Sequence, residues 1–304
     1  MIDTAKVIEF LRTGAPLLPE DLIIILGPTA SGKTKLAVDL AQQLNAEIIS
    51  ADSRQVYRHM DIGTGKDIHA YGTIPYHLID IVDPGEKYNI TRFLEDFEVA
   101  YQDIRSRDKS VIVCGGTGFY LQALLEPKPY TQIPIDLAKR TELETVDKEV
   151  LKHILEERAV PEDFAIDFSS KKRMIRALEI LDWLAQHPHT SLDLQPVYRA
   201  KVIGIAPDLE TRRNNISARL YQRLEEGMIE EVKNLLQSGL THEELEYYGL
   251  EYKYISYYLQ GRMSYGEFVR KLETEIHRYA KRQMTYFRKM EKDGIAIHWL
   301  TNEH

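Results

Sequence analysis

Short apolar runs alternate with amphipathic segments along the first third of the chain. Residues Leu22–Leu26 and Ser110–Cys114 are apolar or β-branched runs, which are typical of parallel strands buried on both faces. Residues from Lys33 to about Leu44 repeat apolar positions at helical spacing, and Glu47–Ala51 is a further strand candidate. Strands separated by helical segments predict right-handed βαβ units and therefore an α/β fold with a parallel sheet.

The pattern changes after Glu126, where prolines at positions 127, 129 and 134 interrupt it. The chain then reads as mostly charged helix until a strand-like run at Lys201–Ala206. We therefore expect a helical insertion over residues 127–198, placed within a core formed by residues 1–126 and 199–304. The C-terminal part of that core is predicted to be helical up to a last strand at Ile295–Leu300.

Composition limits the possible classes. The 304 residues include 43% hydrophobic and 28% charged residues, which is enough apolar material for a substantial core. No apolar stretch approaches the ~18 residues of a membrane span, and the N-terminus lacks a secretion signal. The single cysteine, Cys114, excludes an internal disulfide and a cysteine-based zinc site. We expect a cytoplasmic monomer that does not bind membranes.

Net charge bears on the partners. A formal charge of -8 argues against indiscriminate binding of polyanions. It leaves room for a nucleic-acid partner at a local basic surface. Such a surface lies between Arg270 and Lys292, where basic residues alternate with aromatic ones. Basic residues pair with phosphates while aromatic rings stack on unpaired bases of RNA loops. The alternative is a surface helix that buries its aromatic side chains, as we expect for Tyr286 and Phe287.

The strongest motif follows the first predicted strand. Its eight residues match the pattern G-x-x-x-x-G-K-[ST] of a phosphate-binding loop and are Gly27, Pro28, Thr29, Ala30, Ser31, Gly32, Lys33 and Thr34. In such loops backbone N–H groups and a helix N-terminus surround a phosphate. The lysine reaches phosphate oxygens and the hydroxyl binds Mg²⁺. The strand before the loop and the helix after it favour a P-loop NTPase-like core that binds a di- or triphosphate.

Two further residues end predicted strands at the carboxyl edge of the sheet. Asp52 follows the second strand and is a candidate general base; a turn or helix-capping role is equally consistent with its position. Thr117 lies in the turn Gly115–Gly118, whose alternative role is only a tight connection to a helix. Nucleotide hydrolases carry an acid at the end of an apolar strand. Here Gly115 and Gly116 stand there, which argues against a motor ATPase.

The order of motifs resembles the bacterial tRNA dimethylallyltransferases. The resemblance extends from about Leu22 to Leu300. It rests on the phosphate loop and on the segments Asp52–Tyr57, Met60–Lys66, His77–Asp80, Asp83–Pro84, Gly115–Tyr120, Arg176–Glu179 and Ala280–Gln283.

This resemblance implies a reaction. Members of that family transfer a dimethylallyl group from dimethylallyl diphosphate to N6 of the adenosine 3′-adjacent to the anticodon, with Mg²⁺. Asp52 is then expected to take the proton from the adenine amine, and Thr117 to orient the adenine or the bridging oxygen. Lys33, Thr34 and Mg²⁺ would stabilise the departing diphosphate. Arg219 aligns with an arginine that the family uses on that diphosphate.

Arg219 has competitors within the same predicted helix, Thr211–Glu226, namely Arg212, Arg213 and Arg223. A solvated surface charge is the alternative role for each of them.

The resemblance also implies residues that bind the tRNA anticodon stem-loop. The expected set is Asp52, Ser53, Arg54, Gln55, Thr117, one of Lys139 and Arg140, then Lys172, Arg173, Met174, Ile175 and Arg176, with Lys281 and Arg282. Without the resemblance, the members of this set that lie in the insertion would be interpreted as solvated helix surface.

The chain also departs from the family pattern. The family commonly has a tyrosine and a basic residue after the glycine at position 249, where this chain has Leu250 and Glu251. Lys172 stands where a glutamine is usual. Both departures affect expected tRNA contacts. A small-molecule kinase and an RNA-binding ATPase remain alternatives, because both also use a phosphate-binding loop.

Overall fold

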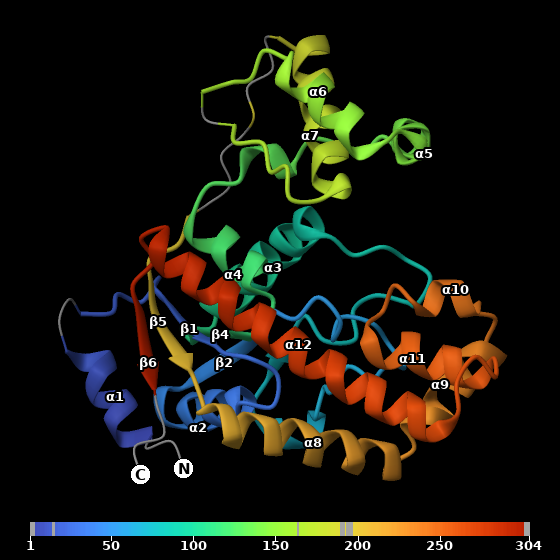
Figure 1. Ribbon diagram of the computed structural model, residues 1–304. Coiled ribbons are helices and arrows are strands. Elements are labelled where there is room, and N and C mark those ends of the chain that lie inside the picture. Colours follow the sequence, from blue (N-terminus) through green and yellow to red (C-terminus); the bar gives the residue numbers. More distant parts are fainter. Residues whose placement is uncertain (1–3, 14–15, 163, 189–191, 193–196, 301–304) are drawn as a thin grey trace. The chain divides into compact units, whose positions relative to one another are not determined.

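The structure is a computed structural model that describes residues 4–13, 16–162, 164–188, 192 and 197–300. The chain divides into two compact units (Figure 1). The first, the core unit, comprises Met1–Glu126 and Val197–His304, and the second, the insertion unit, comprises Pro127–Pro196. The end of the insertion near Pro196 lies outside the described residues.

The core unit is built on one six-stranded sheet, whose strands pair in parallel in the order β3-β2-β4-β1-β5-β6. The predicted α/β fold is therefore confirmed. The short edge strand β3 escaped prediction, since two residues carry no alternation. The strands are β1 (Leu22–Leu26), β2 (Ala46–Ser50), β3 (Tyr76–His77), β4 (Ser110–Gly115), β5 (Ala200–Ile205) and β6 (Ile297–Leu300).

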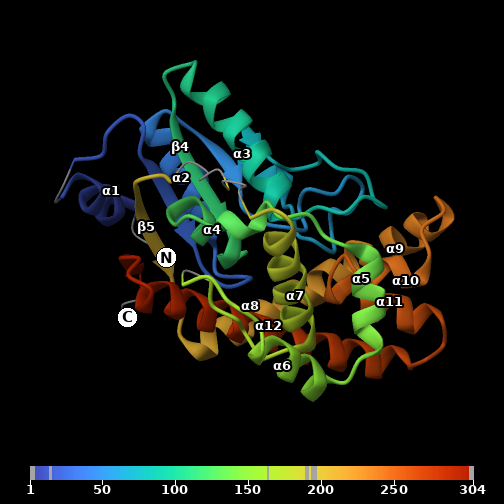
Figure 2. The same cartoon turned by 90° about the horizontal axis from the view of Figure 1, so that it is seen from above.

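Helices cover both faces of the sheet. Side chains of β1 alternate between two cores, with Leu22, Ile24 and Leu26 in one and Ile23 and Ile25 in the other. The second core takes the buried faces of α1 (Thr4–Arg12) and α2 (Lys33–Leu44). The first takes those of α3 (Ile90–Arg105) and α4 (Gly118–Leu125), which lie beside β4 in Figure 2. The central strands β1, β2 and β4 are buried on both sides, as the apolar runs of β1 and β4 predict, whereas the edge strands β3 and β6 are partly exposed.

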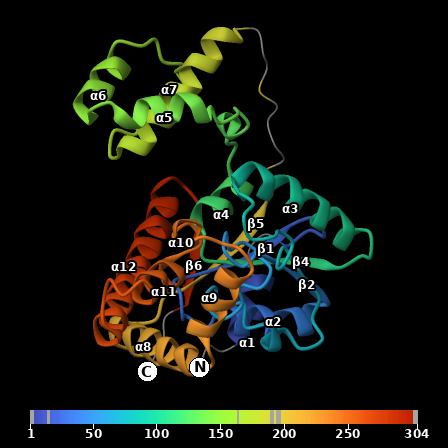
Figure 3. The same cartoon turned by 90° about the vertical axis from the view of Figure 1, so that its right-hand side faces the viewer.

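The C-terminal helices pack onto that same core. Figure 3 shows α8, α9, α11 and α12 gathered beside one another, in agreement with their contacts. The helices of this group are α8 (Leu209–Glu225), α9 (Met228–Gln237), α10 (His242–Leu245), α11 (Leu250–Leu259) and α12 (Tyr265–Lys292). The short helix η1 (Ile68–Tyr71) lies at the other core, where it contacts α2.

Helix α12 begins with a capping box, in which Ser264 and Glu267 satisfy each other's backbone N–H groups. Its apolar stripe, which includes Phe268 and Phe287, is fully buried. The opposite face keeps its basic residues in solvent. No described helix is long and apolar enough to cross a membrane.

The insertion unit has a small core of its own, in which Leu151 and Leu155 of α6 meet Met174 and Ile175 of α7. Its described elements are η2 (Pro129–Thr131), α5 (Leu137–Thr145), α6 (Lys148–Glu156) and α7 (Lys171–Gln186). Each of the three α-helices starts after an Asp or Ser whose side chain accepts a hydrogen bond from a first-turn N–H group.

The turns at the carboxyl edge of the sheet pack tightly. The N–H of Ala51 donates to the carbonyl of Cys114 (2.9 Å), and the N–H of Thr117 donates to the carbonyl of Ala51 (3.3 Å). A Cβ atom on Gly115 would lie 2.2 Å from the Ala51 carbonyl oxygen. Only glycine therefore fits, and the segment that follows β2 is fixed against the turn that follows β4.

We predict that Gly115→Ala destabilises the core unit by about 1–3 kcal/mol, because the added methyl group meets backbone that cannot move away freely. The control is Gly266→Ala in α12, where the nearest atom would lie 3.7 Å away. That change should be neutral or stabilise by up to about 1 kcal/mol. Urea unfolding of both variants measures the difference, and equal midpoints would contradict the prediction.

Candidate active site

The phosphate loop connects β1 to α2 through left-handed backbone. Gly32 has a φ of +86° and Ala30 a φ of +59°, which turns the loop so that α2 begins at Lys33. The Lys33 ammonium donates to the Pro28 carbonyl (2.8 Å) across the loop. The Ser31 hydroxyl is buried and finds no hydrogen-bond partner within the described structure. These features fit a loop that binds an anion, as the motif predicts.

One side chain of α12 joins the phosphate loop to the neighbouring glycine turn. The Gln283 amide oxygen accepts from the N–H of Thr29 (2.9 Å), and its nitrogen donates to the carbonyl of Gly116 (2.9 Å). Gln283 is buried. The sequence places this residue in a motif but gives it no role. A polar residue inside an otherwise apolar helix stripe is the signal that points to it.

Asp52 and Thr117 meet at the end of β2. One carboxylate oxygen of Asp52 accepts from the N–H of Arg54 (2.9 Å), so the turn role considered for this residue is present. The Thr117 hydroxyl accepts from the N–H of Ser53 (3.1 Å), which links the two turns. Asp52 is only partly buried. A turn role and a chemical role are compatible, because a carboxylate has a second oxygen.

These elements surround a single cavity of about 410 Å³. Its walls include most of the side chains that the sequence analysis singled out in the core unit, namely Thr29, Lys33, Thr34, Asp52, Ser53, Arg54, Gln55, Thr117, Arg219 and Arg282. Lys281 is exposed on α12 and is not part of the wall. The phosphate loop and the Asp52 turn therefore open into the same space.

The cavity carries desolvated cations. Burial lowers the pKa of Lys33 to about 8, and the nearby Arg219 adds to this effect. Arg219 donates to the carbonyl of Gly65 (3.3 Å) and pairs with Asp67. Arg223 is buried, burial lowers its pKa, and one guanidinium nitrogen has no hydrogen-bond partner among the described residues. Positive groups held out of water in this way favour binding of an anion.

Arg219 and Arg223 both line the cavity, whereas Arg212 and Arg213, the other two candidates for the diphosphate-binding arginine, do not. From the sequence, Arg223 was only an alternative to Arg219 for binding the diphosphate, although it is the more buried of the two arginines in the wall. Glu251, one of the departures from the family pattern, also lies in the wall, and burial raises the pKa of its carboxyl.

Two arginine–tyrosine pairs line the cavity. The Arg54 guanidinium lies 4.8 Å from the centre of the Tyr247 ring, and Arg282 lies 5.9 Å from that of Tyr279. Both rings are more than a third exposed. Flat cationic and aromatic surfaces of this kind stack on nucleobases. Tyr247 was missed in the sequence because it belongs to no motif.

In the insertion unit, several basic residues of the expected set are engaged internally. Arg140 forms two hydrogen bonds with the buried carboxylate of Glu179 (2.7 and 2.9 Å). Arg176 donates to backbone carbonyls, the shortest of these bonds being to Ile133 (2.6 Å). Lys139 pairs with Asp182. These contacts tie α5 and the segment before it to α7.

The remaining members of the set lie at the start of α7. Met174 and Ile175 are buried in the core of the insertion unit, so their side chains support α7 rather than face a ligand. Lys172 and Arg173 are exposed. Arg173 forms an ion pair with Asp167 (2.5 Å), itself half-exposed.

A magnesium site at this cavity would depend on few protein groups. The described residues contain no cluster of three or more His, Cys, Asp or Glu side chains that could hold a metal. Thr34 lines the cavity beside Lys33. Mg²⁺ commonly binds through one or two protein oxygens, substrate phosphates and water. The residues present fit that mode and do not fit a metal cage made by protein alone.

Comparison with known protein families places most of the chain, the insertion unit included, within one of them. A family described as IPP transferase matches residues 55–290, and one described as isopentenyl transferase matches residues 20–71. A tRNA dimethylallyltransferase 1 of Azobacteroides pseudotrichonymphae is 49% identical over 92% of each chain. A tRNA dimethylallyltransferase 2 of Porphyromonas gingivalis is 48% identical over 92% of this chain and 93% of the relative.

Solved structures agree with these matches. A tRNA isopentenylpyrophosphate transferase from Bacillus halodurans is similar with a TM-score of 0.66 and 34% identity, over 93% of this chain and 90% of that one. A eukaryotic dimethylallyltransferase acting on tRNA is similar with a TM-score of 0.73 and 26% identity, over 93% of this chain and 74% of that one.

We predict that the contribution of Lys33 to pyrophosphate binding declines above about pH 8. The pKa of Lys33 is lowered to about 8, so at higher pH the free protein carries a neutral amine that must be protonated to bind an anion. Calorimetry with Mg²⁺ and pyrophosphate from about pH 7 to about pH 10 measures this. The ratio of the affinities of the unchanged protein and Lys33→Met should fall by up to about tenfold per pH unit.

Pyrophosphate itself also titrates over this pH range, but this affects the affinity of both proteins equally and therefore cancels in the ratio. Lys33→Arg provides a matched control, since a guanidinium keeps its charge over this range. A ratio independent of pH would show that Lys33 stays charged and would contradict the prediction.

Proposed function

The chain belongs to the IPP transferase family, and we propose that it transfers a dimethylallyl group from dimethylallyl diphosphate to N6 of the adenosine 3′-adjacent to the anticodon of tRNA. Its relatives are named tRNA dimethylallyltransferases, which supports prenyl transfer to tRNA. The observation that carries the proposal is the single cavity onto which the phosphate loop, Asp52 and Thr117 all open. An anion site and a candidate base lie where both substrates of such a transfer must meet.

The diphosphate end of the donor is assigned to the cationic side of the cavity. Lys33 and Arg219 supply positive charge there, and the N–H groups at the start of α2 add to it. Thr34 and the diphosphate oxygens would hold Mg²⁺, which supplies further positive charge to the leaving group when bound. Preorganised positive groups stabilise charge that grows as the diphosphate departs.

The transfer itself is one substitution at carbon. The adenine N6 forms a bond to C1 of the dimethylallyl group while the bond from C1 to the diphosphate oxygen breaks. The diphosphate leaves with the electron pair of that bond. The free oxygen of the Asp52 carboxylate takes the N6 proton. The Thr117 hydroxyl, which accepts a hydrogen bond from the N–H of Ser53, orients the adenine beside Asp52.

The adenosine must leave the anticodon loop stack to reach this cavity. Enzymes that modify bases flip the target into a pocket and hold its neighbours by stacking. The two arginine–tyrosine pairs, Arg54 with Tyr247 and Arg282 with Tyr279, are suited to that stacking. Gln55 supports the site by connecting two of its segments. Its amide oxygen accepts a hydrogen bond from the Ser50 hydroxyl, and its amide nitrogen donates to the carbonyl of Gly65.

We assign the phosphate contacts of tRNA to exposed basic residues in each unit. On α12 these are Lys281 and Arg282, and on α7 of the insertion unit they are Lys172 and Arg173. Soluble tRNA as the substrate favours a cytoplasmic location, and we take a monomer as the functional form.

The rival function is that of a small-molecule kinase, which would use the same loop for ATP. The protein is incubated with Mg²⁺, unmodified tRNA and either prenyl-labelled dimethylallyl diphosphate or γ-labelled ATP. Label should appear in tRNA from the prenyl donor alone. Transfer of the ATP label to a small molecule would instead establish a kinase, and tRNA-stimulated ATP hydrolysis would establish an ATPase.

We predict that Asp52→Asn lowers turnover by roughly 10²-fold or more, because the amide cannot accept the N6 proton. The substitution keeps an oxygen for the N–H of Arg54, so the turn should persist. Single-turnover transfer to tRNA gives the rate, and filter binding gives the tRNA affinity, which should change little. Near-normal turnover would remove Asp52 from the chemistry.

We predict that Lys281→Ala and Arg282→Ala each weaken tRNA binding and flatten its salt dependence. Each lost phosphate contact should reduce the slope of log K against log salt concentration by about 0.7–0.9. Titrations between about 50 mM and 200 mM salt measure this slope. Lys233→Ala on α9, where the lysine pairs with Glu230, is the control. A salt-dependence slope equal to that of the control would show that this face of α12 does not contact the phosphates of tRNA.

A further inference from the structure

The segment Asp61–Lys66 forms one wall of the cavity through Gly63, Thr64 and Gly65. It contains no helix or strand, so its position depends on the groups that hold it. The sequence places it in a motif without giving it a role.

Glu231 of α9 holds the beginning of this segment. Its carboxylate accepts from the consecutive N–H groups of Asp61 (2.7 Å), Ile62 (2.7 Å) and Gly63 (3.0 Å), and from the hydroxyl of Tyr252 (2.8 Å). The Tyr252 ring packs so closely that a Cβ on Gly63 would lie 2.6 Å from it. Consecutive N–H groups of this kind form an anion-binding concavity, which here is filled by a carboxylate of the same chain.

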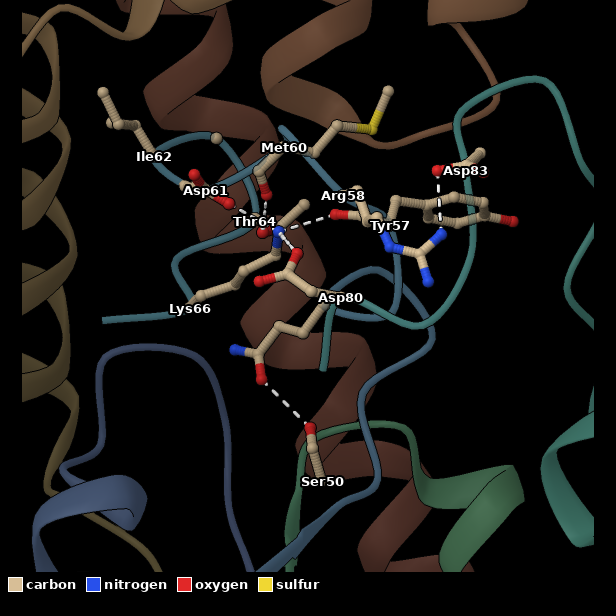
Figure 4. A network of polar contacts seen from close by, with 12 residues as sticks. Ser50, Tyr57, Arg58, Met60, Asp61, Ile62, Thr64, Lys66, Asp80 and Asp83 are labelled. Carbon is tan, nitrogen blue, oxygen red and sulfur yellow. Dashed lines mark hydrogen bonds and ion pairs between the residues drawn. The ribbon is translucent and has the colours of Figure 1, made fainter. Parts of the chain in front are cut away.

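Lys66 holds the end of the segment. Its side chain is 1% exposed, and its ammonium contacts the Tyr57 carbonyl (2.6 Å) and the carboxylates of Asp61 and Asp80, as Figure 4 shows. The N–H groups of Gly65 and Lys66 also donate to the Asp61 carbonyl (3.0 and 3.1 Å). The segment is therefore closed on itself and fixed at both ends.

The fixed segment sets the position of the cavity arginines. The Gly65 carbonyl accepts from Arg219 (3.3 Å) and from Gln55 (3.0 Å). A Cβ on Gly65 would lie 1.6 Å from a guanidinium nitrogen of Arg223 and 2.6 Å from one of Arg219. A small displacement of this backbone would therefore change where both guanidinium groups lie.

We propose that Glu231 is a positioning residue for the diphosphate site, acting through the Asp61–Lys66 segment on Arg219. It touches neither substrate. It supplies a charged acceptor that keeps the Gly65 carbonyl where Arg219 must donate, so that the guanidinium is ordered before the anion arrives. Ordering a group in advance removes that cost from binding. The identity of the anion as a diphosphate rests on the proposed function.

The test uses the full chain with Mg²⁺ and inorganic pyrophosphate, without prenyl donor or tRNA. Glu231→Gln keeps the shape of the side chain but replaces one acceptor oxygen with a nitrogen that cannot accept an N–H. We expect calorimetry to show affinity lowered by about tenfold or more. Glu230→Gln, an exposed neighbour on the same helix, should leave the affinity unchanged.

A double-mutant cycle with Arg219→Lys separates positioning from general loss of structure. The loss caused by Arg219→Lys should be much smaller when Glu231→Gln is already present, because both changes act on one interaction. Additive losses would overturn the proposal. Tyr252→Phe, which removes only the hydroxyl on Glu231, should weaken binding by about two- to fivefold and decides the matter if Glu231→Gln does not fold.

Unchanged pyrophosphate affinity in a folded Glu231→Gln or Tyr252→Phe variant would also overturn the proposal. These results are independent of the reaction itself. Failure of the unchanged protein to transfer a prenyl group would count against the proposed function and would leave the pyrophosphate result standing.

Discussion

The turns at the carboxyl edge of the sheet approach one another so closely that side chains are excluded, and the site depends on this constraint. A Cβ on Gly27 would lie 2.7 Å from the Ile205 carbonyl oxygen, and one on Gly116 would lie 2.4 Å from the Gln283 amide nitrogen. The close approach lets the Gln283 amide reach both the phosphate loop and the next turn. The Gln283 amide, together with the backbone hydrogen bonds of Ala51 to Cys114 and Thr117, fixes the anion site and the Asp52 turn relative to each other.

The electrostatics of the cavity follow from this geometry. Lys33 loses hydration, which lowers its pKa to about 8, and Arg223 is buried with part of its hydrogen-bonding capacity unused. The protein bears the cost of desolvating these groups when it folds, and a bound anion offsets it. A departing diphosphate gains negative charge as its bond to carbon breaks, so the same groups bind the leaving group more strongly as the reaction proceeds.

Much of this could be predicted from the sequence, and the remainder has physical reasons. The buried strands gave continuous apolar runs, and the phosphate loop gave a specific motif, so both were located. The last strand starts at Ile297, two residues later than predicted, because the N–H of Ile295 still donates a hydrogen bond to the carbonyl of Met290 near the end of α12. Tyr247 and Gln283 act through contacts between distant segments, which local patterns do not record. The burial of Met174 and Ile175 likewise depends on packing against α6.

In the proposed mechanism, the phosphate loop holds a leaving group while Asp52 faces the attacking amine in the same cavity. A structure with a tRNA anticodon stem-loop and an unreactive thiodiphosphate analogue of the prenyl donor tests it most directly. We expect the diphosphate to lie against Lys33 and Arg219, and a carboxylate oxygen of Asp52 to lie within about 2.6–3.2 Å of the adenine N6. An adenine bound elsewhere, or a donor whose diphosphate lies outside the phosphate loop, would contradict it.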